Sequence, residues 1–101
     1  MRTRGAVIRS VPGAYEVIDL ELDDPRADEI GVRMVASGLC HSDDHIALGD
    51  TPLGMYPMAG GHEGAGVVTR AGPNGKGIVE GDHVVFSFVS ACGHCWHCAD
   101  G

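Results

Sequence analysis

Three cysteines lie at three-residue intervals near the end of the chain. They are Cys92, Cys95 and Cys98 in the stretch A-C-G-H-C-W-H-C-A-D-G. Thiolates separated by two residues can ligate one ion, because a turn at Gly93 brings both sulfurs to the same centre. A total of four cysteines would also allow disulfides, but histidines are interleaved and no secretory signal is recognised, which favours a metal. The run therefore predicts three of the four ligands that a structural zinc needs.

An iron–sulfur cluster is the alternative for this run, because C-x-x-C-x-x-C also begins the ligand run of ferredoxins. Such a cluster would leave the other motifs of the chain without an explanation, so zinc is the preferred interpretation. His94 and His97 lie inside the run and could supply the fourth ligand.

A second possible metal site is divided between two motifs. Cys40 precedes a predicted helix, whose exposed N–H groups favour an anion, although a single such cysteine can equally be a small buried hydrophobe. His62 stands in G-G-H-E-G-A-G, where glycines allow close backbone approach and Glu63 can orient a ligand; alone, it would be an ordinary loop histidine. A catalytic zinc uses three protein ligands and leaves one position open. Two ligands are visible here, and a third is missing.

The elements that must position these residues are predicted to be mostly strands. Glycine supplies 16 of the 101 residues and only 5% of residues are aromatic, which favours a turn-rich β architecture over helices. Alternating apolar and polar residues predict strands at 15–22 and 30–38, the first half-buried and paired in a hairpin with a strand at 6–9. Further strands are expected at 67–68 and after the turn at 81–82.

One short helix is expected at 42–48. Ser42, Asp43 and Asp44 lie where a helix N-terminus accepts a cap and negative charge, and Gly49 lies where the helix would stop. The segment 51–58 contains two prolines and is predicted to be a loop.

Composition excludes several classes of function. The chain has a formal net charge of −7, and its basic residues are scattered, so neither nucleic acid nor a membrane surface is expected as a partner. No apolar run approaches the roughly 20 residues of a membrane span. The expected location is cytoplasmic, and the length predicts one domain or part of one.

Four motifs together resemble the zinc-dependent medium-chain alcohol dehydrogenases. They are G-L-C-H-S-D-D-H at 38–45, G-H-E-G-A-G at 61–66, G-D-H-V-V at 81–85 and C-G-H-C-W-H-C at 92–98. The resemblance implies that residues 1–101 are an incomplete GroES-like catalytic domain, mostly β with one short helix, and that the Rossmann domain is absent from this chain. It also implies that the third catalytic ligand and the fourth structural ligand lie beyond the chain.

The resemblance implies a role for each matching residue. Cys40 and His62 correspond to ligands of the catalytic zinc, and Cys92, Cys95 and Cys98 to ligands of the structural zinc. Ser42 matches the hydroxyl that accepts the substrate proton, and His45 matches the histidine that passes this proton towards solvent. His41 matches a residue that contacts the cofactor pyrophosphate. Asp43 and Glu63 match acidic residues that orient the zinc ligands. From the residues alone, Ser42 could be only a helix cap, and His41 and His45 could share a solvated helix face.

The implied function is oxidation of an alcohol, or reduction of an aldehyde, by hydride transfer to or from NAD(P). It requires one catalytic and one structural zinc, and the parent protein is expected to be a homo-oligomer, dimer or tetramer. The chain alone is predicted to be inactive. Two alternatives are a small non-enzymatic structural-zinc module and a zinc-free reductase relative. Gly75 departs from the family, which has an apolar residue there; this is expected to loosen a surface loop without touching the zinc.

Overall fold

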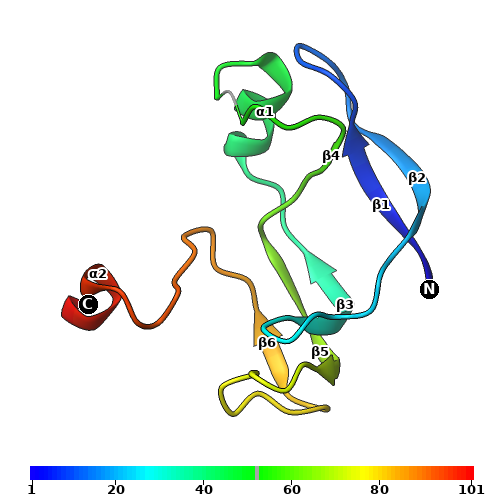
Figure 1. The fold of residues 1–101 in the computed structure, drawn as a ribbon. Coiled ribbons are helices and arrows are strands. Elements are labelled where there is room, and N and C mark those ends of the chain that lie inside the picture. The colour runs from blue at the N-terminus through cyan, green and yellow to red at the C-terminus, as the bar shows by residue number, and fades with distance from the viewer. Residues whose placement is uncertain (52) are drawn as a thin grey trace.

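The computed structural model describes residues 1–51 and 53–101, and in these residues it contains two three-stranded sheets and two short helices. Their order along the chain is β1(Arg2–Ile8), β2(Glu16–Glu21), β3(Ile30–Ser37), α1(His41–Leu48), β4(Met58–Ala59), β5(Gly64–Ala71), β6(His83–Val85) and α2(Trp96–Asp100). The predicted mostly β architecture is confirmed, and α2 is an addition that the sequence did not predict (Figure 1).

The first sheet has the order β2-β1-β4, with antiparallel pairing throughout. Its β1–β2 hairpin confirms the predicted opening, but β1 begins at Arg2, four residues earlier than expected. Ile18 and Leu20 lie on the half-buried face of β2, whereas Leu22 follows the strand and is exposed. Val7 and Ile8 of β1 are buried and form the core on this side.

The second sheet has the order β3-β5-β6, and its centre is β5. The strand expected at 67–68 is longer and extends over Gly64–Ala71. Gly66 allows β5 to approach β3 closely, because a Cβ at this position would collide with the carbonyl oxygen of Arg33. Register shifts interrupt the β3–β5 pairing between Gly31 and Val32 and between Met34 and Ala36. Met34, on the face predicted to be apolar, is exposed. The apolar strand predicted after residue 82 ends early, at Val85.

Helix α1 starts one residue before its predicted position. Its N-cap is Cys40 and not Ser42, because the Asp43 carboxylate accepts a hydrogen bond from the Cys40 N–H (3.3 Å) and closes a capping box at that residue. Gly49 ends the helix in the left-handed conformation (φ 86°), as predicted. In the segment predicted as a loop, Pro52 lies outside the described residues, and Met58 begins β4. Neither helix of the described residues has the length and apolar character that a membrane crossing needs.

Candidate metal centres

The first centre forms where the end of β3 meets the start of β5. Possible ligand atoms of Cys40, His62 and Glu63 all lie within 4.8 Å of one another. The contact is fixed by the backbone, because the Gly38 N–H donates to the Glu63 carbonyl at 3.0 Å, and the Ser37 hydroxyl donates to the same oxygen at 3.2 Å. A Cβ at Gly38 would collide with the Glu63 carboxylate. The glycine thus permits the approach that brings the two motifs together.

Asp43 faces the Nδ1 side of the His62 ring. Its Oδ1 is 3.4 Å from His62 Nδ1, while Nε2 of the same ring is 4.0 Å from Glu63 Oε1. The side chains of Asp43 and His62 are only 15% and 20% exposed, and Asp43 Oδ1 is buried without a hydrogen bond among the described residues. A metal-binding histidine usually donates its other ring N–H to a carboxylate. Asp43 Oδ1 is placed to receive that proton and to leave Nε2 free for a cation.

Replacing Asp43 with asparagine should weaken metal binding at the first centre by roughly 10- to 100-fold, because loss of such an outer carboxylate disturbs ligand orientation. The dissociation constant can be measured by zinc competition with a chelating dye. The matched control is Asp44→Asn, since Asp44 is on the same helix but is 75% exposed and lies 3.8 Å from His41. Equal affinities for the two variants would contradict a role for Asp43 at this centre.

The helix residues expected near this centre divide into two groups. Ser42 lies at the centre, with its Oγ 3.4 Å from the Cys40 sulfur. His41 and His45 contact each other edge to face at 4.5 Å between ring centroids, and the His41 side chain is 78% exposed. His45 Nδ1 lies 3.3 Å from Asp50 Oδ2. The two histidines therefore do share a solvated helix face, whereas Ser42 is not the helix cap.

Two aromatic residues contact the first centre and were not predicted to do so. The Phe88 ring lies 4.7 Å from the His62 ring and is mostly exposed. The Tyr15 hydroxyl donates to the Asp43 carbonyl at 3.2 Å, and burial, followed by the charge of Asp43, raises the pKa of Tyr15. A raised pKa keeps the phenol protonated as a donor. The apolar pattern around Phe88 predicted only a strand, and nothing local linked Tyr15 to this centre.

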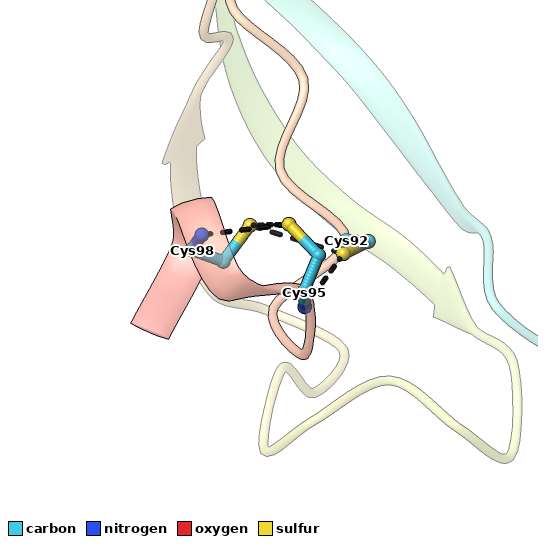
Figure 2. Close-up of side chains that lie close together, drawn as sticks. All are labelled: Cys92, Cys95 and Cys98. Carbon is cyan, nitrogen blue, oxygen red and sulfur yellow. Dashed lines mark hydrogen bonds between the residues drawn. The ribbon is translucent and has the colours of Figure 1, made fainter. Parts of the chain in front are cut away.

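The second centre is the cysteine lobe, which we define as residues 92–101. Cys92, Cys95 and Cys98 turn their sulfurs towards one another (Figure 2), with Sγ–Sγ distances of 3.8 Å between Cys92 and Cys98 and 3.5 Å between Cys95 and Cys98. All four cysteines of the chain are free thiols. Gly93 has the positive φ (83°) of the turn that the spacing predicted.

Backbone N–H groups surround the sulfurs of the cysteine lobe. The His94 N–H, then the Cys95 thiol and N–H, lower the pKa of Cys92 to about 7, and the Gly93 N–H is the main group that lowers the pKa of Cys98. These donors favour thiolates, the form in which cysteine binds metal. The cluster of ligand atoms contains the three thiols and neither histidine; His94 Nδ1 instead faces the Cys92 carbonyl at 3.0 Å.

The loop that follows β5 contains Gly75, where the family has an apolar residue. This loop reaches the cysteine lobe, because Lys76, the next residue, donates from its ammonium to the Cys92 carbonyl at 2.6 Å. A Cβ at Gly75 would come within 3.2 Å of the Gly72 carbonyl, so the tight loop has little room for the family's apolar side chain. Gly75 is therefore one residue from the side chain that contacts the second centre, but it is not itself one of the ligands.

Comparisons with known proteins agree with this geometry. Residues 26–101 match the family described as the alcohol dehydrogenase GroES-like domain. Alcohol dehydrogenase B of Mycobacterium tuberculosis is 45% identical over 100% of this chain and 27% of its own length. Benzyl alcohol dehydrogenase from Acinetobacter calcoaceticus superimposes with a TM-score of 0.89 at 36% identity, covering 100% of this chain and 27% of that chain. The cobalt- and zinc-bound thermostable alcohol dehydrogenase from Pyrobaculum aerophilum gives 0.86 at 32% identity, covering 100% and 31%.

The two sheets and their junction therefore define a GroES-like β domain. The chain belongs to the family of the alcohol dehydrogenase GroES-like domain. The chain spans about a quarter (27%) of the length of curated relatives that it matches.

Proposed function

We propose that residues 1–101 are an incomplete GroES-like catalytic domain of a longer NAD(P)-dependent alcohol dehydrogenase. The observation that carries the proposal is that the ligand atoms of Cys40 and His62 lie within 4.8 Å of each other at the β3–β5 junction, in a chain of this family. The names of the relatives support an alcohol or an aldehyde as substrate. The proposal includes a cytoplasmic location and assembly as a homodimer or homotetramer.

Both ligand clusters fit zinc. Sulfur and nitrogen donors are typical of zinc sites, whereas Mg²⁺ and Ca²⁺ prefer sites made of oxygen. The buried, unpaired Asp43 Oδ1 beside His62 suits an imidazole that binds metal through its far nitrogen. Cys40 and His62 would hold the catalytic ion, and Cys92, Cys95 and Cys98 the structural one. When bound, the catalytic zinc supplies Lewis acidity that polarises the substrate oxygen.

Proton movement is assigned to side chains of α1. Ser42 is close enough to the centre to accept the proton of a bound alcohol, since its Oγ is 3.4 Å from the Cys40 sulfur. His45 is half exposed and paired with Asp50, so it can pass a proton to solvent. His41 is exposed on the same face, where it can bind an anionic group such as the cofactor pyrophosphate. Hydride transfer to the nicotinamide requires a nucleotide-binding domain outside residues 1–101.

Alcohol-dependent reduction of NAD or NADP tests this function. A longer protein that contains residues 1–101 should turn over, and the 101-residue chain alone should not, because hydride transfer needs a nucleotide-binding domain that residues 1–101 do not form. Ser42→Ala in the longer protein should lower kcat by roughly 10²-fold, the lower end for loss of a positioned proton acceptor. The matched control is Ser90→Ala, at an exposed serine of the segment after β6. Turnover by the 101-residue chain, or a kcat for Ser42→Ala equal to wild type, would contradict the proposal.

Metal analysis separates this proposal from its two alternatives. A non-enzymatic zinc module would use the cysteine lobe alone, so replacing Cys40 or His62 would leave the zinc content unchanged. A zinc-free reductase relative would not place Cys40 against His62, and that contact argues against it.

A further inference from the structure

The cysteine lobe has few attachments to the rest of the molecule. The last backbone hydrogen bond before the lobe runs from the Phe86 N–H to the Gly64 carbonyl at 2.9 Å. Figure 1 shows α2 at the end of an extended segment that leads away from both sheets. Within residues 1–51 and 53–101, one hydrogen bond joins the lobe to the sheets, and it is the bond from Lys76 to the Cys92 carbonyl.

Lys76 is held firmly by its own loop. The Gly72 N–H donates to the Glu29 carbonyl and the Asn74 N–H to the Ala27 carbonyl, both at 2.9 Å, so the loop is bound to the chain just before β3. Lys76 itself adopts φ 51°, in the left-handed region that a side chain other than glycine rarely occupies. The loop that carries Lys76 is therefore tied by backbone hydrogen bonds to the chain next to the second sheet.

The group that accepts this bond belongs to the metal-binding turn. The Cys92 carbonyl and the Gly93 N–H are the two ends of one peptide group, and that N–H donates to the Cys98 sulfur at 3.4 Å. Because a peptide group is planar, holding its carbonyl also fixes the direction of its N–H. A cation on the carbonyl further polarises the group and strengthens the N–H donor. Gly93 has the left-handed φ (83°) that favours glycine, and its Cα lies close to the Lys76 nitrogen, since a Cβ there would be 2.8 Å from that atom.

We propose that Lys76 is a positioning residue for the metal centre of the cysteine lobe: its ammonium fixes the Cys92–Gly93 peptide group so that the Gly93 N–H points at the Cys98 sulfur. The positive charge also offsets the negative charge of three thiolates around one divalent ion. This inference rests on the proposed metal site. His94 Nδ1, at 3.0 Å from the same carbonyl, is a neighbour from within the lobe and cannot link the lobe to the sheets.

The chain is suited to a direct test, because Lys76 is its only lysine and Trp96, at the start of α2, is its only tryptophan. Co²⁺ is titrated into the full 101-residue chain, and binding at the lobe is followed by thiolate-to-cobalt absorption and by quenching of Trp96 fluorescence. Lys76→Met should weaken Co²⁺ binding about tenfold, the order expected for a charge-assisted hydrogen bond, and should shift the cobalt absorption bands. Lys76→Arg should restore both to near wild type.

Two controls separate positioning from other effects. Arg70→Met removes the same charge from an exposed residue paired with Asp24 at 2.9 Å and should leave Co²⁺ binding within about twofold of wild type. Lys76→Gly removes the side chain at a backbone conformation that glycine adopts freely, so it should weaken binding without straining the loop. It also replaces Lys76→Met if that variant does not fold.

The outcomes distinguish the two proposals. If the wild-type lobe gives neither thiolate-to-cobalt absorption nor Trp96 quenching, the metal site fails and the role of Lys76 fails with it. If wild type binds Co²⁺ and the Lys76→Met and Lys76→Gly variants bind it equally well with unchanged bands, the metal site stands and the role of Lys76 is wrong.

Discussion

Replacing Cys40 with alanine in the longer protein is expected to lower kcat/KM for alcohol oxidation by roughly 10³-fold or more. The physical reason is that a metal ion contributes several kcal/mol of charge stabilisation, and each 1.36 kcal/mol corresponds to about tenfold in rate. Cys40 contributes the sulfur of a cluster whose ligand atoms lie within 4.8 Å of one another. His62→Ala should have the same effect. The measurements are steady-state kinetics and zinc content per chain, which should fall by one ion.

The matched control for His62→Ala is His83→Ala, because His83 lies exposed on β6 and belongs to neither ligand cluster among the described residues. That variant should keep wild-type kinetics and zinc content. Full activity after loss of Cys40 would remove the basis for a catalytic metal at this junction. Lost activity with full zinc content would assign Cys40 a role other than ligation.

Replacing Cys95 with serine is expected to release the second ion and to loosen the cysteine lobe while the first centre keeps its metal. Structural zinc contributes on the order of 10 kcal/mol or more to small domains that fold around it. Among the described residues, one hydrogen bond joins the lobe to the rest of the chain, from Lys76 to the Cys92 carbonyl. Zinc content should fall by one ion, Trp96 fluorescence should shift, and chymotrypsin should cut at Trp96 faster than in wild type.

Each centre provides the control for the other. Cys40→Ala should leave the Trp96 signal and the protease resistance of the lobe unchanged, and Cys95→Ser should leave metal binding by Cys40 and His62 unchanged. If Cys95→Ser kept both ions and the same cleavage rate, the three thiols would not form a structural metal site. The crossed pattern thus tests whether there are two independent centres in this chain.

Sequence reasoning was most successful where the structure is local. Gly49 ends α1 and Gly93 makes the turn of the cysteine lobe, and both depend on the freedom of glycine at positive φ. The hairpin of β1 and β2 also follows from alternation and a nearby turn. The errors lie at element ends and bulges: a register shift follows Met34 in β3, and the carboxylate of Asp43 places the helix cap at Cys40 and not at Ser42.

By itself, the sequence determined that three thiols would share one centre, because residues 92–98 can bring their sulfurs together within a single turn, without closing a long loop. It offered Cys40 and His62 as two possible ligands from their local surroundings, but only the resemblance to a family joined them in one site. Tertiary structure decided that they meet, since antiparallel pairing of β3 with β5 carries Gly38 against Glu63 and closes the chain between them. Tertiary structure also decided that Lys76 reaches the Cys92 carbonyl. This contact depends on the hydrogen bonds that hold the loop after β5 against the chain before β3, and no spacing in the sequence encodes those bonds.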